Sequence, residues 1–195
     1  MLLLTAPSSL RERLARLGRV RLLRRCAALR PEQVREPALR ASQLALRFCA
    51  RRVEAATKAA SAFEREIRTL VEQLAPALLE QRGVGPISAA AILVSWSHPG
   101  RLKSEAAFAR LAVVAPIPAS SGQVIRYRLE RGGDRRLNRA LHTIALQRSR
   151  TDPDTIAYVT RRRSEGKSLR DRLRCIKRYL ARSLFRMLEA TPATA

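Results

Sequence analysis

Two adjacent serines, Ser120 and Ser121, stand directly before Gly122, and a run of arginines follows them. A serine hydroxyl can attack a phosphodiester when another group takes its proton and cations neutralise the charge that develops on the phosphate. The arginines suited to the second task are Arg126, Arg128, Arg131, Arg135, Arg136 and Arg139. An ordinary Ser-Ser-Gly turn is the alternative, and the residues alone leave both interpretations open.

No proton acceptor for such a serine is evident close to it in the sequence. His98 and His142 are the only histidines, and each is better explained as a surface or packing residue. Asp152 and Asp154 flank a proline, as in a turn with helix caps, and do not resemble a metal site. No HExxH, P-loop or GxSxG pattern occurs, so the sequence does not indicate the chemistry of those motifs.

The charge of the chain favours a polyanionic partner. Its 195 residues carry 39 Lys and Arg against 16 Asp and Glu, a formal net charge of +23. So large an excess opposes compaction unless a polyanion neutralises it, and nucleic acid is the most common one. A bias towards arginine in a GC-rich genome is the alternative, but it explains arginine in place of lysine and not the scarcity of acids. Aromatic residues make up only 4 %, which gives weak support to base stacking.

The cysteines and the first residues indicate the compartment. Cys26, Cys49 and Cys175 lack the paired spacing of a zinc site or a disulfide framework. The initial run of three leucines is too short for a signal peptide or a membrane span. We therefore expect a cytoplasmic bacterial protein that associates with the nucleoid when it is bound to DNA.

A long helix is predicted over residues 38–78, where a heptad pattern runs without glycine or proline as far as Ala75. At 1.5 Å per residue it would reach roughly 55 Å, which favours a partner helix. One interpretation is a dimerising coiled coil, and the other is a hairpin with the preceding helical segment. The two sets of seam positions are Leu39, Leu46, Val53, Ala60, Ile67 and Leu74, and Cys49, Ala56, Phe63 and Leu70.

After the long helix, a Gly-x-Gly turn at Gly83 and Gly85 precedes the segment Pro86 to Trp96, as in a helix-hairpin-helix. Such a turn offers backbone N–H groups to a DNA phosphate, although a tight inter-helix turn explains the glycines as well. Ser104 is a predicted N-cap, and Val124 to Leu129 alternates like a short strand or a hairpin arm.

Three further helices are expected in the C-terminal part. One begins at Asp134, and its apolar residues are Leu137, Ala140, Leu141, Ile144 and Ala145. Two more are separated by Gly166, and the apolar face of the last one carries Leu173, Ile176, Leu180, Leu184 and Met187. The predicted fold is mostly α: a long coiled-coil-like helix followed by a small helical domain with a helix-hairpin-helix and a short β-hairpin or strand. The domain limits we expect are 1–37, 38–78 and 79–190.

Three blocks resemble a known family: "GVGPISAAAILVSW", "SEAAFARLAVVAPIPASSGQVIRYRLERGGDRRLNRALHTIAL" and "DPDTIAYVTRRRSEGKSLRDRLRCIKRYLARSLFRML". In this order they are similar to the C-terminal transposase domain of the insertion-sequence one-ten family, which is grouped with the one-sixteen and nine-oh-two elements. The resemblance runs from about Leu79 to Leu188.

The resemblance implies a DNA transposase that forms a serine-linked DNA intermediate. Family members combine an N-terminal RuvC-like domain, whose carboxylate quartet binds Mg²⁺, with a coiled-coil connector and this helical domain. The family pattern places the nucleophile directly before a glycine, which favours Ser121 here and leaves Ser120 as the alternative. The implied partners are element-end and target DNA and a structured guide RNA, with a homo-oligomer through residues 38–78 and no membrane.

The sequence departs from the family because no RuvC-like half precedes the matching region, and residues 1–37 look like a helical remnant of the segment that follows it. We expect no metal or cofactor in this chain, with Mg²⁺ required only by the RuvC-like domain. The polypeptide alone is then predicted to bind nucleic acid without cutting or joining DNA. The alternatives are a regulator without catalytic activity that oligomerises with intact transposase, and a ribosome-associated or chromosome-coating protein that uses only its charge.

Overall fold

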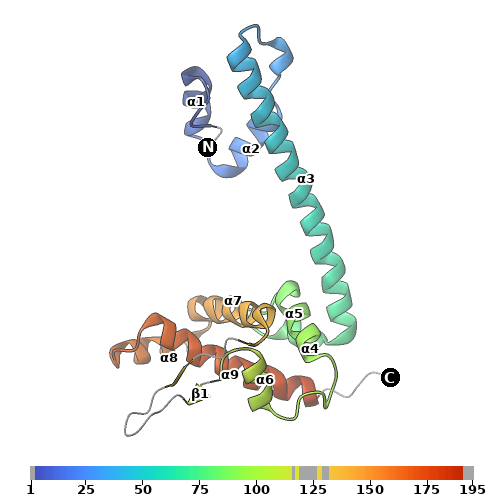
Figure 1. Cartoon of the computed structure of the whole chain (residues 1–195), viewed down its shortest axis with the longest axis vertical. Helices are drawn as coiled ribbons and strands as arrows, with labels where there is room; N and C mark the ends of the chain where they lie inside the picture. Colours follow the sequence, from blue (N-terminus) through green and yellow to red (C-terminus); the bar gives the residue numbers. More distant parts are fainter. Residues whose placement is uncertain (1–2, 116, 119–126, 129–131, 191–195) are drawn as a thin grey trace. The chain divides into compact units, whose positions relative to one another are not determined.

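The computed structural model describes residues 3–115, 117–118, 127–128 and 132–190. This part of the chain is mostly α-helical, as predicted, and it forms two compact units, Met1–Phe63 and Glu64–Ala195. The boundary falls inside the long helix α3 (Pro37–Leu74) (Figure 1). The limits 1–37, 38–78 and 79–190 stay a prediction. No helix among the described residues has the length and apolarity needed to cross a membrane.

The first unit is a small helical cluster. Its elements are α1 (Ser8–Ala15), α2 (Arg19–Ala27), a 3₁₀ turn (Pro31–Gln33) and the first part of α3. Apolar side chains from these helices form one core, because a short amphipathic helix is stable only when another element covers its apolar face. The buried apolar residues are Ala6, Leu10, Leu14, Cys26, Leu46 and Ala50. An ion pair between Arg47 and Glu32 adds to this cluster.

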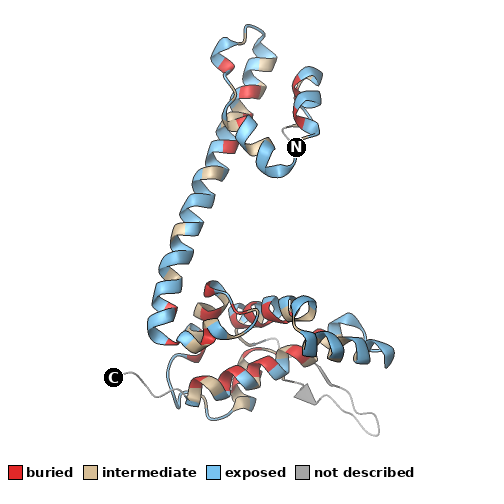
Figure 2. Ribbon diagram, turned by 180° about the vertical axis from the view of Figure 1, so that it is seen from behind, coloured by how far each residue is buried: buried red, intermediate tan, exposed pale blue. Residues whose placement is uncertain are grey.

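Helix α3 has 38 residues and ends at Leu74, four residues before the predicted limit of 78. Ala75 has a φ of −158° and precedes Pro76, whose ring disfavours the helical conformation in the residue before it. The heptad seam is buried at Leu46 and exposed at Val53 and Phe63, which are 38 % and 69 % accessible. Figure 2 shows the pale exposed surface along the helix. The hairpin interpretation therefore accounts for the start of α3, and the middle of the seam is open.

The second unit is built around helix α7. Its helices are α4 (Pro76–Glu80), α5 (Pro86–Trp96), α6 (Glu105–Leu111), α7 (Arg135–Thr151), α8 (Pro153–Ser164) and α9 (Leu169–Ala190). Helix α7 packs against α5, α8 and α9, and α6 packs against α9. Gly166, with φ +75°, lies in the turn between α8 and α9, where the sequence places a helix boundary.

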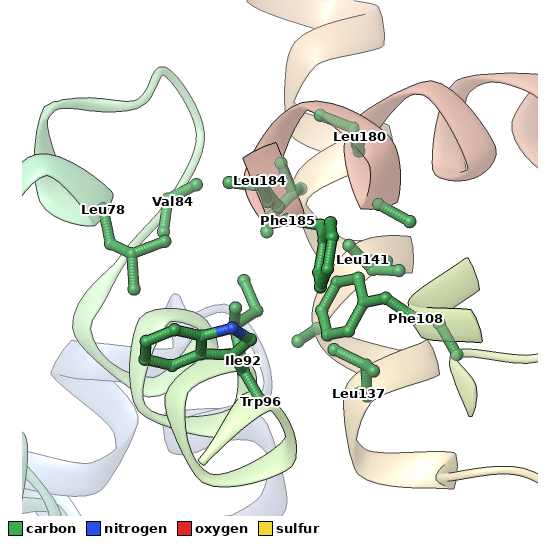
Figure 3. Close-up of a cluster of buried hydrophobic side chains, with 14 of the residues drawn as sticks. Leu78, Val84, Ile92, Trp96, Phe108, Leu137, Leu141, Leu180, Leu184 and Phe185 are labelled. Carbon is green, nitrogen blue, oxygen red and sulfur yellow. The ribbon is translucent and has the colours of Figure 1, made fainter. Parts of the chain in front are cut away.

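The core of the second unit follows the predicted apolar faces. All five apolar residues predicted on α7 are buried: Leu137, Ala140, Leu141, Ile144 and Ala145. Four of the five predicted on α9 are buried as well: Leu173, Ile176, Leu180 and Leu184. Phe108 of α6 meets Phe185 of α9 with ring centroids 5.7 Å apart, and Trp96 closes the α5 side (Figure 3). This core gives the second unit a fixed helical platform.

Two short strands, β1 (Ile117–Pro118) and β2 (Tyr127–Arg128), pair antiparallel between α6 and α7 in the chain. The predicted strand Val124–Leu129 lies mostly outside the described residues, which include only its residues 127 and 128. Each strand has only two residues. The pairing therefore shows only that the chain before α7 runs back beside the residues that follow α6.

Candidate nucleic-acid site around the serine segment

We call residues 116–131, which join α6 to α7, the serine segment. Ser120, Ser121, Gly122, Arg126 and Arg131 lie outside the described residues, and of Arg128 only the backbone is described. Pro118 pairs with Tyr127, so the chain on the two sides of residues 119–126 comes together. What the structure shows in detail is how the two ends of the serine segment are anchored.

The entry to the serine segment is a tightly bonded turn after α6. Val113 has φ +59°, a conformation that is strained for a β-branched residue. The N–H groups of Val114 and Ala115 both donate to the carbonyl of Ala109, at 2.9 and 3.2 Å. Ser104 caps the start of α6 by accepting from the Ala107 N–H at 3.2 Å, as the sequence predicts. The direction in which the chain leaves α6 is thus set by backbone bonds.

The exit from the serine segment lies against its entry. The N–H of Asp134 donates to the carbonyl of Leu111 at 2.7 Å. Gly133 packs so closely that an added Cβ would lie 2.4 Å from the same carbonyl oxygen and 2.5 Å from Cγ2 of Val113. Only glycine fits this approach. The two ends are therefore held together by contacts that involve no residue of the segment itself.

Asp134 connects this anchor to α5 and α7. Its carboxylate accepts from the N–H groups of Arg136 and Leu137 at the start of α7, and from the Ser95 hydroxyl at 2.6 Å. Burial alone would raise the pKa of Asp134, but the Ser95 hydroxyl and the two N–H groups outweigh it and lower that pKa. The acidic start of α7 predicted from the sequence is therefore also the point at which α5 joins the anchor.

Lys177 of helix α9 contacts the same region through Asn138 of α7. The Asn138 amide donates to the carbonyl of Ala112 at 2.6 Å, and the Lys177 ammonium donates to the amide oxygen of Asn138 at 3.3 Å. Burial, followed by repulsion from Arg174, lowers the pKa of Lys177. Among the described residues, no carboxylate forms an ion pair with this lysine. We call Ser95, Gly133, Asp134, Asn138 and Lys177 the anchor residues.

Of the anchor residues, the sequence pointed only to Asp134, as a helix start. Ser95 and Asp134, like Asn138 and Lys177, are 39 positions apart. Periodicity describes one helix at a time and carries no signal for such a pair. Locally, the sequence offers one indication of such a contact: Asn138 follows Leu137, beside the apolar face of α7.

The other predicted phosphate ligands fall in two places. Arg135, Arg136 and Arg139 are exposed on the first turns of α7, directly after the serine segment, and no carboxylate among the described residues pairs with them. Their side chains are therefore accessible to an anion. The structure brings these three arginines to the exit of the segment.

Gly83 and Gly85 lie in the turn between α4 and α5, away from the anchor residues. Gly83 has φ +80°, and its added Cβ would meet Arg148 at 3.4 Å, so this glycine packs against α7. Gly85 has open space around it and precedes α5, whose N-terminus has no side-chain cap. The tight-turn interpretation explains Gly83, and the phosphate contact of both glycines stays a prediction.

Helices α8 and α9 carry a second concentration of positive charge. Arg161, Arg163 and Lys167 are exposed near the turn at Gly166. Further along α9, Arg182 and Arg186 both pair with Glu105 of α6, at 2.7 and 3.0 Å. The described residues contain no group of three or more His, Cys, Asp or Glu side chains placed to hold a metal ion.

Part of the chain is similar to known proteins. Residues 75–160 match the model of the transposase family IS116/IS110/IS902. The chain is 35 % identical over 130 residues to an uncharacterised 43.6 kDa protein of insertion element IS110 from Streptomyces coelicolor, and the match covers 65 % of this chain and 32 % of that protein. It is 38 % identical over 94 residues to an uncharacterised 42 kDa protein of insertion element IS900 from Mycobacterium paratuberculosis. That match covers 46 % of this chain and 23 % of the relative. The chain thus spans about a third or less of these relatives. Residues 75–160 are thus similar to the IS116/IS110/IS902 family of transposases.

Proposed function

We propose that this chain takes part in DNA transposition by presenting Ser121 to a DNA phosphodiester, with Ser120 as the alternative nucleophile. The family supports a transposition-related function. The observation that carries the proposal is the anchor: contacts from α5, α7 and α9 hold both ends of the serine segment. A reactive group carried on a loop needs a rigid support to be positioned.

In the proposed step, the Ser121 oxygen loses its proton and forms a bond to phosphorus. One P–O bond of the DNA strand breaks, and the leaving oxygen takes up a proton, so the strand becomes linked to the protein. Arginines stabilise the charge on the phosphate oxygens because guanidinium groups donate two parallel hydrogen bonds to them. We assign this role to Arg126, Arg128 and Arg131 of the segment and to Arg135, Arg136 and Arg139 of α7.

Mg²⁺ belongs, on the family resemblance, to a RuvC-like domain and not to the residues described. We therefore propose that the 195-residue polypeptide by itself binds nucleic acid and that DNA cleavage needs a full-length protein of the same element. Gly83 and Gly85 would contribute backbone N–H groups to a phosphate as a helix-hairpin-helix. Element-end DNA, target DNA and a structured guide RNA are the proposed ligands, and the cytoplasm and nucleoid the proposed location.

The test is formation of a covalent protein–DNA adduct on nicked element-end DNA. The wild type, Ser121→Ala and Ser120→Ala chains are each mixed with a full-length protein whose own serine has been replaced. We expect an adduct with the wild type and with Ser120→Ala, and none with Ser121→Ala. An adduct that survives Ser121→Ala and disappears with Ser120→Ala would transfer the role to Ser120. Survival in both single variants would exclude each as an essential nucleophile.

A second candidate function is a regulator without catalytic activity that oligomerises with intact transposase. The exposed middle of the α3 seam favours it, since Val53, Ala56 and Phe63 are accessible on one long helix. Recombination that is unaffected by Ser121→Ala but lost when the seam is disrupted would support this candidate over the first.

A chromosome-coating or ribosome-associated role would use only the charge. It predicts equal affinity for element ends and random DNA, with a steep loss of affinity as salt rises. Competition binding between the two DNAs separates it from the first two candidates.

A further inference from the structure

A cavity of about 340 Å³ opens between the end of α7, helix α8 and helix α9, away from the anchor residues. Its size lies at the lower end of small-ligand sites, about 300 to 1,000 Å³. Ile176 and Leu180 of α9, both buried, form an apolar part of the lining. Tyr158 and Tyr179 line it as well, although the whole chain has only three tyrosines. Two of the three tyrosines of the chain thus line one cavity.

The two tyrosines form an edge-to-face pair, with ring centroids 6.0 Å apart and planes at 84°. Tyr179 is 62 % accessible, so much of this ring has no covering side chain. The Arg161 guanidinium lies 5.6 Å from the centre of the Tyr158 ring, at cation–π distance. Burial first, and then the neighbouring Cys175, raises the pKa of Tyr158 to about 12. This phenol is therefore neutral at any working pH.

Some polar side chains of the cavity already have hydrogen-bond or ion-pair partners, and others do not. Asp152 caps α8 through the Thr155 N–H at 3.1 Å and pairs with Arg82 at 3.4 Å. Asp154 and Ser183 are exposed, and among the described residues neither side chain has a hydrogen-bond or ion-pair partner. An exposed ring, an apolar wall and a free carboxylate therefore meet in one concave site.

We propose that this cavity binds one unpaired base of the nucleic acid that the domain holds. An aromatic ring stacks on any base, and stacking of this kind contributes about 1 to 3 kcal/mol per base. A cavity of this size admits a planar base that has left its stack, and not a paired duplex. Arg161, which lies over the Tyr158 ring, and Arg148, which lines the cavity, would hold the adjoining phosphates.

The free carboxylate of Asp154 gives the site a preference among bases. An ionised carboxylate only accepts hydrogen bonds, so it favours the exocyclic amino groups of adenine, cytosine and guanine. Uracil and thymine present carbonyl oxygens at the equivalent positions and are disfavoured. The inference rests on the proposed nucleic-acid binding, but it concerns a site distinct from the serine segment and does not depend on catalysis.

The probe is a duplex with a single-nucleotide bulge, made in DNA and in RNA, beside the same duplex without the bulge. The 195-residue chain is expected to bind the bulged form more tightly, and 2-aminopurine at the bulge should change its emission on binding. Tyr179→Ala should weaken binding to the bulged form about tenfold without changing the dependence on salt. Tyr179→Phe should retain the preference, and Asp154→Asn should reduce the discrimination against uracil or thymine.

Leu169→Ala is the matched control, because Leu169 is exposed on the same helix and does not line the cavity. Arg161→Ala should weaken binding of the bulged and paired forms equally and reduce the slope of log affinity against log salt by about one. A preference confined to RNA would assign the base to an RNA partner, and one confined to DNA to an extruded DNA base. Equal binding of bulged forms by Tyr179→Ala and wild type would overturn the inference and leave the proposed function intact. Failure of the wild type to bind any nucleic acid would contradict both.

Discussion

At the scale of residues, the anchor depends on a few side chains whose replacement has distinct physical effects. Gly133 leaves no space for a side chain beside the Leu111 carbonyl. Asp134 satisfies two N–H groups of α7 and the Ser95 hydroxyl with one carboxylate. Asn138 joins the entry of the serine segment to Lys177. These contacts lie outside the proposed chemistry, so folding measurements can test them.

Gly133→Ala should destabilise the second unit by about 1 to 3 kcal/mol, because the added methyl group overlaps backbone atoms that cannot move independently. Chemical denaturation monitored through Trp96, the single tryptophan of the chain, reports on this unit. Gly85→Ala is the matched control, since nothing lies within 4 Å of its added Cβ. Equal stability of the two variants would contradict the close approach at Gly133.

Asp134 should make stability depend on pH in the acidic range. Its folded-state pKa is lowered from 3.8, so its contribution is fully present above the unfolded value and is lost as pH falls through the folded one. We expect the wild type to exceed Asp134→Asn by about 1 kcal/mol at pH 6 and the difference to shrink below about pH 4. A difference that stayed constant down to pH 2 would contradict ionisation of this carboxylate as the cause.

At the scale of elements, sequence patterns predicted what depends on neighbours along one helix. The Ser104 cap, the buried face of α7 and the break at Gly166 were predictable because each follows from spacing within a few residues. The positive φ of Val113 and the Asn138–Lys177 contact were not, because tertiary contacts produce them. Likewise, a 4 % aromatic content gave no sign that Tyr158 and Tyr179 lie together.

Polar substitutions in the middle of α3 should leave the stability of the folded chain nearly unchanged. They should disrupt only its association with a partner chain. Phe63 is 69 % accessible, so Phe63→Glu should change unfolding stability by less than about 0.5 kcal/mol. If the seam joins two chains, the same variant should abolish self-association in analytical ultracentrifugation. Lys58→Glu, on the same exposed stretch but outside the seam, is the control. Unchanged association of Phe63→Glu would exclude this seam as the interface.

At the scale of the whole molecule, the net charge of +23 makes binding to nucleic acid strongly dependent on salt. Removing the exposed cations of α7 by a combined Arg135→Ala and Arg139→Ala substitution should reduce the slope of log affinity against log salt by about two. Fluorescence anisotropy over a salt series measures this slope. An unchanged slope would show that these arginines do not contact phosphates.

The most direct measurement for the central claim is mass spectrometry of the adduct formed when this chain is mixed with a full-length partner that lacks its own serine. We expect DNA linked to the 21.8 kDa chain at the peptide containing Ser121, and no adduct with Ser121→Ala. DNA linked to a different residue, or no adduct while the unmodified full-length protein cleaves the same DNA, would contradict it.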